Sequence, residues 1–127
     1  MSSIELSLAI ASAHPEKLAE FYAFATNGKL KPGKNQNHWE VVVGGGLKIH
    51  LYKPSQKKPT LKKGRVVSLC LEKEPSQKPL SIINEWAEIL VCRGAKIAQE
   101  PKVEPFGTEV WMTDPEENDF LIFVPII

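Results

Sequence analysis

The sequence has few cysteines, almost no net charge and no long hydrophobic run, and each of these absences excludes a class of protein. Its two cysteines, Cys70 and Cys92, form neither a disulfide framework nor a C-x-x-C redox or zinc motif. Sixteen basic residues against fifteen acidic residues give a formal charge of +1, so nothing indicates a nucleic-acid or anionic-membrane partner. The N-terminal segment carries Glu5, lacks a basic region, and is too short and alternating for a signal peptide or a membrane span. We therefore expect a cytoplasmic protein.

The length and composition fit a single globular domain. Of the 127 residues, 43% are hydrophobic and 24% are charged. A chain of this size can bury roughly two thirds of its unfolded surface in one core. We expect one domain over residues 1–127.

The first half of the chain predicts a strand, a helix and a hairpin. Residues 6–12 alternate between large and small side chains, as in a strand with two different faces. Pro15 suits the first position of a helix, and Asn27-Gly28 suits its end. The apolar stripe of that helix comprises Leu18, Phe21, Tyr22 and Ala25. A loop rich in Lys, Asn and Gly follows, and then two strands over 38–43 and 47–52 flank the turn Gly44-Gly45-Gly46.

The second half repeats this order, which indicates a duplicated unit. A strand begins near Val67, a helix follows, and Gly94 ends it. Strands are predicted over 95–98, 108–113 and 120–124. The offset is 61 residues from Leu6 to Val67 and 66 from Gly28 to Gly94, and the difference falls in the polar loop 72–79. The stripe of the second helix comprises Ile82, Ile83, Trp86, Ile89 and Leu90.

Two stretches resemble the vicinal oxygen chelate superfamily, which includes glyoxalase I, extradiol dioxygenases and bleomycin-binding proteins. They are EKLAEFYAF after the first strand and VWMTDPEENDFLIFVP near the end. The resemblance implies an α+β fold of two tandem βαβββ units, about 4–54 and 64–125, with a curved mixed sheet forming a cleft and helices on its outer face. The sequence departs from the family pattern at Glu117, where glycine is usual, and at His14, where an acidic residue is usual.

Alternation predicts which strand residues lie under the helices and which face the cleft. A one-residue slip would move every side chain to the other face, so this parity is strongly constrained. The repeat makes Trp39 equivalent to Glu109, which would place it in the cleft, but the parity of the 38–43 strand stays open. Residues expected under the helices are Leu6, Leu8, Ile10, Leu47, Ile49, Leu51, Val67, Leu69, Leu71, Val110, Met112, Phe120, Ile122 and Val124. Residues expected to face the cleft are Ser7, Ala9, Lys48, His50, Tyr52, Val66, Ser68, Cys70, Glu109, Trp111, Leu121 and Phe123.

The resemblance also bears on metal binding. Metal-using relatives place His or Glu at four cleft positions, which correspond here to Ser7, His50, Val66 and Leu121. Only His50 can bind a divalent ion, whereas a catalytic site needs about three ligands. We therefore expect no metal and no cofactor. The acidic turn at 114–119 is then a solvated hairpin in which Asp114 bonds the turn's own amides.

Within the cleft, His50 is the candidate base and Glu109 its candidate partner, since a carboxylate beside a histidine orients it for general base catalysis. An ordinary hydrogen-bonded histidine and a surface glutamate are the competing interpretations. Trp111 is expected to stack on a ligand or to fill the cavity. His14 and His38 are expected to be exposed. The predicted ligand-binding residues are His50, Tyr52, Ser68, Glu109, Trp111, Leu121 and Phe123.

Three functions are compatible with these residues. The preferred one is a metal-free homodimer that binds a small, partly apolar or aromatic molecule in its cleft, as bleomycin-binding proteins do. The second is a metal-dependent lyase, isomerase or dioxygenase of the glyoxalase type whose ligands lie at other positions, for example His50 with Glu109. The third is an interaction module in which a partner chain covers Trp111. The residues leave open whether any reaction is catalysed.

Overall fold

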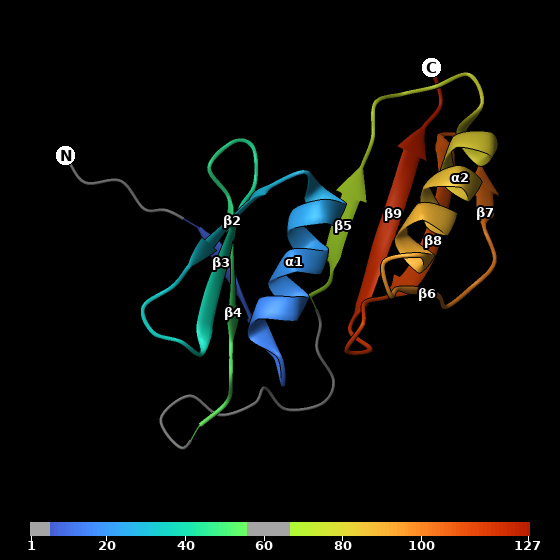
Figure 1. Cartoon of the computed structure of the whole chain (residues 1–127). Helices are drawn as coiled ribbons and strands as arrows, with labels where there is room; N and C mark the ends of the chain where they lie inside the picture. The colour runs from blue at the N-terminus through green and yellow to red at the C-terminus, as the bar shows by residue number, and fades with distance from the viewer. Residues whose placement is uncertain (1–5, 56–66) are drawn as a thin grey trace. The chain divides into compact units, whose positions relative to one another are not determined.

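The computed structural model describes residues 6–55 and 67–127, which belong to two compact units, Met1–Gly64 (unit 1) and Arg65–Ile127 (unit 2). Unit 1 contains a four-stranded mixed sheet of order β1-β4-β3-β2 and one helix (Figure 1). β1 runs parallel to β4, and the other pairs are antiparallel. In chain order its elements are β1 (Ser7–Ala11), α1 (Pro15–Thr26), β2 (Lys29–Pro32), β3 (His38–Val42) and β4 (Lys48–Tyr52).

Unit 2 repeats this topology. Its sheet has the order β5-β9-β8-β6, with the short strand β7 also paired to β8. β5 runs parallel to β9, as β1 does to β4. Its elements are β5 (Leu69–Glu72), α2 (Pro79–Val91), β6 (Lys96–Ile97), β7 (Lys102–Glu104), β8 (Gly107–Thr113) and β9 (Asp119–Pro125).

The predicted α+β fold of two βαβββ units is therefore confirmed, with two strands that the sequence did not reveal. The segment after α1 was expected to be a loop, but residues 29–32 form β2, and residues 102–104 form the unpredicted β7. Both are short and carry lysines, so they lack the apolar alternation that signals a strand. They exist because β3 and β8 offer unpaired backbone groups at their edges.

The two helices begin in the same way. Ser12 Oγ accepts a hydrogen bond from the backbone N–H of His14 at 3.1 Å, and Ser76 Oγ accepts one from Lys78 at 2.9 Å. In each case a proline follows at the first helical position, where its missing N–H costs nothing. This shared serine turn lies 64 residues apart in the two units, and it is a mark of duplication that the apolar pattern does not contain.

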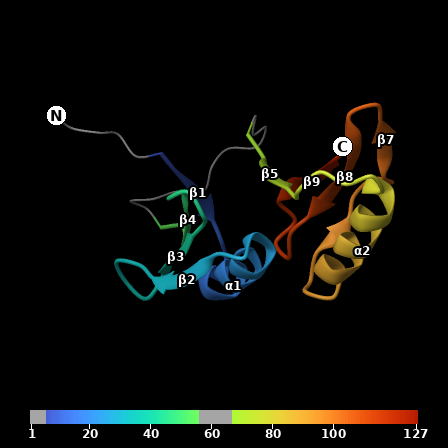
Figure 2. The same ribbon diagram turned by 90° about the horizontal axis from the view of Figure 1, so that it is seen from above.

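Each helix covers one face of its own sheet (Figures 1 and 2). Trp86 on α2 is 7% exposed, as predicted for the core. Burying a large apolar side chain contributes about 1.5–3 kcal/mol, so these layers fix the register of the strands. Val41 of β3 is also fully buried, although the parity of its strand was left open. The buried strand residues that were predicted beneath the helices are Ile49, Leu51, Val110, Met112, Phe120, Ile122 and Val124.

Three residues expected in the core are exposed instead. Leu6 is 77% exposed and Val67 65%, because β1 and β5 begin after them, at Ser7 and Leu69. Ile89, on the stripe predicted for α2, is 47% exposed, while Leu90 beside it is fully buried. Periodicity alone therefore made the predicted apolar stripe of α2 wider than the face that the helix buries.

The acidic turn between β8 and β9 is organised by Asp114, as predicted. Its Oδ1 accepts hydrogen bonds from the backbone N–H groups of Glu116 (2.8 Å) and Asn118 (3.0 Å), and Oδ2 accepts one from Asn118 Nδ2 (2.8 Å). Asp114 is only 2% exposed. Glu117, which replaces the family glycine, has a φ of 66°. The turn thus keeps the left-handed conformation although a non-glycine residue there costs about 1–2 kcal/mol.

Candidate functional site: the open faces of the two sheets

The face of each sheet opposite its helix is called here its open face. Residues paired across strands project from the same face, and Ile49 and Leu51 lie beneath α1, so the alternate residues of β4 lie on the open face. On unit 1 these pairs bring together side chains from all four strands. They are Ser7, Ala9 and Ala11 of β1, Lys29 and Lys31 of β2, His38, Glu40 and Val42 of β3, and Lys48, His50 and Tyr52 of β4.

The register settles the parity of β3. Trp39 pairs with Leu51 and therefore lies on the helix side, so it does not join the open face. The repeat had suggested that Trp39 corresponds to Glu109. The pairing shows instead that His38, opposite Tyr52, corresponds to Glu109, opposite Phe123. The sequence misled because His38-Trp39-Glu40 has no consistent alternation.

Two histidines of the open face are hydrogen-bonded to each other. His38 Nε2 and His50 Nδ1 are 3.0 Å apart, and the ring centroids are 5.2 Å apart. The centroid separation exceeds the N···N distance by 2.2 Å, which corresponds to the two ring radii laid end to end. The nitrogens therefore lie nearly on the line between the rings, which is the geometry of a direct N–H···N bond.

A backbone amide determines which nitrogen carries the proton. The N–H of Lys34 points to His38 Nδ1 at 3.1 Å, and an amide can only donate. His38 Nδ1 is therefore the acceptor, so the neutral His38 ring has its proton on Nε2. That proton is donated to His50 Nδ1, and the neutral His50 ring consequently has its own proton on Nε2.

His38 was expected to be exposed, but it is only 7% exposed. The loop after β2 wraps around it, and Gly33 donates its backbone N–H to the His38 carbonyl at 2.8 Å. A Cβ at Gly33 would lie 2.5 Å from Cγ of His38, so only glycine lets the ring lie this close to the loop. The sequence contains the residues of this arrangement but no signal that the loop folds over the strand.

Glu40 completes a group with the two histidines. One potential ligand atom from each of His38, Glu40 and His50 lies within 4.8 Å of the others. The group was not predicted, because only His50 stood at a position used by metal-binding relatives. It fits a metal poorly: to bind through Nε2, His38 would have to carry its proton on Nδ1, where it would face the Lys34 N–H.

The open face of unit 2 is apolar at its centre. Trp111 pairs with Leu121, and Leu121 pairs with Cys70, so an indole, an aliphatic side chain and a thiol form one row. Phe123, two residues along β9, stacks at a tilt against Phe106 with centroids 5.8 Å apart. Trp111, Leu121 and Phe123 are all partly buried, as expected for side chains on a face not covered by the helix.

Carboxylates flank this apolar row. Glu109 and Glu72 both pair with Phe123. Cys70 is an exposed residue, but partial burial of its thiol raises the pKa, and the negative charges of Glu72 and Glu109 raise it further. A raised pKa keeps the thiol protonated, which argues against Cys70 as a nucleophile.

The predicted site residues thus divide between the two units. His50 and Tyr52 lie on the open face of unit 1, and Glu109, Trp111, Leu121 and Phe123 lie on that of unit 2. Ser68 is exposed just before β5, and Val66 lies outside the described residues. The proposed pairing of His50 with Glu109 stays a prediction. The partner that the structure gives His50 is His38.

Solved structures with the same fold are numerous. A glyoxalase/bleomycin resistance protein/dioxygenase family enzyme from Burkholderia phytofirmans PsJN matches with a TM-score of 0.76 at 12% identity, over 94% of this chain and 97% of that one. The chain has the fold of the vicinal oxygen chelate superfamily. TnmS3, an antibiotic binding protein from Streptomyces sp. CB03234, matches at 0.66 with 20% identity, covering 98% and 97%. The fosfomycin resistance protein FosX from Mesorhizobium loti matches at 0.64 with 8% identity, covering 99% and 93%.

The comparison by sequence finds no counterpart. No family model matches the chain, and no curated protein matches it. At these identities the structural likeness establishes the fold alone. Among the described residues, no helix is long and apolar enough to cross a lipid bilayer.

Proposed function

We propose that this protein binds a small, partly aromatic molecule without a metal ion, and that the open face of unit 2 holds its apolar part. The supporting observation is the row formed by Trp111 and Leu121, with Phe123 beside it, on a sheet face that α2 does not cover. Ligand sites are typically lined by aromatic and aliphatic side chains with a few polar groups. Glu109, which pairs with Phe123, is proposed as the polar contact beside this row, with Ser68, His50 and Tyr52 as further contacts.

The proposal of a metal-free site rests on Leu121. The family resemblance places an acidic metal ligand at this position, and an aliphatic side chain has no lone pair to offer. The antibiotic-binding neighbour TnmS3 shows that the fold serves binding proteins as well as enzymes. We extend the proposal to a cytoplasmic homodimer in which residues 1–127 act as one domain.

A metal-dependent enzyme of the glyoxalase type is the second candidate, favoured by the grouping of His38, Glu40 and His50. Elemental analysis of protein purified without chelators separates the two candidates. We expect substoichiometric transition metal. Near-stoichiometric nickel, zinc, iron or manganese that is lost in His50→Ala would establish the second candidate instead.

Titration of the protein with a panel of planar aromatic compounds tests the first candidate. Trp111→Ala should weaken binding of any responding compound by about 30-fold or more, because truncating a central tryptophan costs about 2 kcal/mol or more. Trp39→Phe, on the helix side of the other sheet, should leave the affinity unchanged. A panel without any response would favour the interaction module, and a monomer in sedimentation would refute the homodimer.

A further inference from the structure

His50 presents a hydrogen-bond donor rather than a base. Its Nδ1 lone pair is engaged by His38 Nε2, and His38 is held in that state by the Lys34 N–H. The proton of neutral His50 therefore lies on Nε2. For Nε2 of His50 to accept a proton, both hydrogen bonds, from Lys34 to His38 and from His38 to His50, would have to change direction. The backbone N–H of Lys34 can only donate, so this change is not possible.

The Nε2–H group of His50 is open to solvent. Within residues 6–55 and 67–127, His38 is the one hydrogen-bond partner of the His50 side chain, through Nδ1. No buried side-chain nitrogen or oxygen in the described chain lacks a partner. Nε2 must therefore have accessible surface, because it would otherwise be a buried polar atom without a hydrogen bond.

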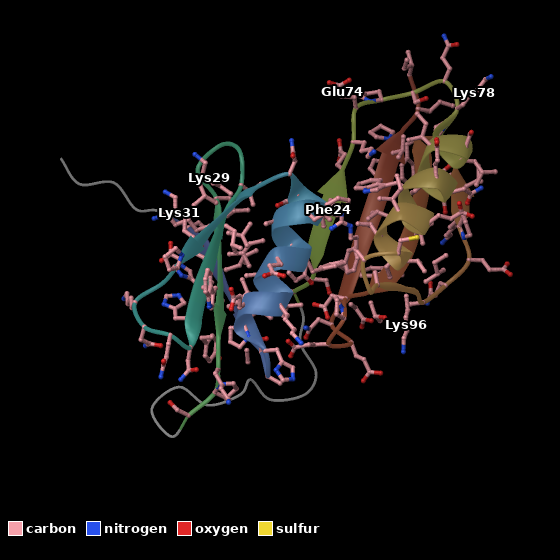
Figure 3. The ribbon with its side chains drawn as sticks, in the orientation of Figure 1. Phe24, Lys29, Lys31, Glu74, Lys78 and Lys96 are labelled. Atoms are coloured by element: carbon pink, nitrogen blue, oxygen red, sulfur yellow. The ribbon has the colours of Figure 1, made fainter. Side chains whose placement is uncertain are left out.

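Three lysines share the open face with this donor, together with the Glu40 carboxylate, which has an oxygen within 4.8 Å of a His50 ring nitrogen. Lys48 lies on the same strand face two residues from His50, and Lys31 lies across Glu40 from it (Figure 3 labels Lys31 and Lys29 on β2). The facing residues of β1 are Ser7, Ala9 and Ala11, which are small and uncharged. The face thus carries three lysines against the single carboxylate of Glu40, and no ion pair within residues 6–55 joins them.

We infer that the open face of unit 1 is a binding site for an anionic oxygen, a carboxylate or phosphate group of a small molecule, with His50 Nε2–H as the directional donor and Lys48 and Lys31 as the positive charges. A neutral imidazole N–H held in one tautomer, with lysines beside it, is suited to stabilising negative charge on oxygen. The residues of β1 beside His50 are small and carry no charge that would oppose an anion. The site lies within unit 1 and needs none of the aromatic residues of unit 2, although it shares His50 with the contacts proposed above.

The tautomer is measured first, on the full chain labelled with ¹⁵N in its histidines. Long-range ¹H–¹⁵N spectra at about pH 8, where histidine side chains in general are uncharged, distinguish protonated from bare ring nitrogens. We expect Nε2 protonated and Nδ1 bare in both His38 and His50. A bare Nε2 on His50 would overturn the inference.

The same sample is then titrated separately with inorganic phosphate and with acetate at constant ionic strength. The His50 Nε2 resonance should shift and saturate, and the anion that saturates at lower concentration defines the class. Exposed His14 serves as the internal control. Equal movement of His14 and His50, or no saturation with either anion, would refute a specific site.

Two substitutions with opposite expected effects on anion affinity complete the test. Lys48→Gln should weaken anion binding about tenfold, and Glu40→Gln should tighten it about twofold to fivefold by removing the one negative charge. Lys17→Gln, exposed on α1, is the matched control and should change nothing. If Glu40→Gln weakens anion binding, or if zinc or nickel binds through His38 Nε2 and is lost in Glu40→Gln, the anion site is wrong. If Lys48→Gln fails to fold, Lys31→Gln on the edge strand replaces it.

Discussion

Replacing Gly33 by alanine tests whether the loop holds His38 in place. The added Cβ would lie 2.5 Å from Cγ, 2.6 Å from Nδ1 and 2.6 Å from the carbonyl oxygen of His38. Carbon atoms do not approach other atoms this closely, so either the loop or the ring must move. His38 is 7% exposed, and its ring is hydrogen-bonded at both nitrogens, to Lys34 and to His50. Moving the loop or the ring would therefore break contacts or hydrogen bonds and destabilise the fold.

The cost follows from these contacts. Overpacking a buried site costs about 1–3 kcal/mol. Loss of the hydrogen bonds from Lys34 to His38 and from His38 to His50 adds about 1 kcal/mol each. Gly33→Ala should therefore lower the free energy of unfolding by about 3–5 kcal/mol, a large part of the 5–15 kcal/mol typical of a folded protein.

Gly44→Ala is the matched control, because an added Cβ there meets nothing within 4 Å and its φ is not positive. It should leave the free energy of unfolding unchanged or raise it by about 0.4–1 kcal/mol, because alanine lowers the conformational entropy of the unfolded chain. Urea unfolding followed by circular dichroism measures both variants, and ¹⁵N spectra follow the His38 ring. Equal midpoints for the two variants, with unaltered His38 nitrogen shifts, would refute the packing described for this loop.

Two further predictions concern unit 2. Glu117→Gly should raise the free energy of unfolding by about 0.5–1 kcal/mol, because the relief of left-handed strain exceeds the extra entropy of glycine in the unfolded chain; a lower melting temperature would contradict this. In a Cys92→Ser background, Glu72→Gln should lower the pKa of Cys70 and so speed its alkylation at about pH 8 by a small factor, since burial is the larger cause of the raised pKa and is unchanged. Glu74→Gln, in the exposed loop after β5, should not alter the rate, and a slower rate in Glu72→Gln would show that the carboxylate acts otherwise.

Local pattern was sufficient for the repeat, the helices and most of the strand faces. Period-two alternation placed Ile49, Leu51, Ile122 and Val124 under the helices, and the apolar stripe with its proline start placed α1. These features are local because each depends on side chains a few residues apart along one element. Alternation failed at two strand ends, where Leu6 and Val67 extend beyond the packed layer, and in β3, where His38-Trp39-Glu40 does not alternate.

The histidine pair was outside the reach of such patterns. Sequence reasoning singled out His50 on its open face but paired it with Glu109 and took His38 to be exposed. The structure joins His38 to His50 through the β3–β4 register, the fold of the 33–37 loop and one backbone N–H. None of these three features produces a periodic pattern in the sequence.

The sequence by itself determined the duplicated architecture, which follows from alternation, and it has leucine at position 121, where the family resemblance implies an acidic ligand. Only the tertiary structure decided which nitrogen of His50 carries its proton, because that depends on a hydrogen bond from Lys34 across a loop to a neighbouring strand. Residue types limit the chemistry that is available, whereas the direction of each hydrogen bond, and with it the choice between donor and base, is set by long-range contacts.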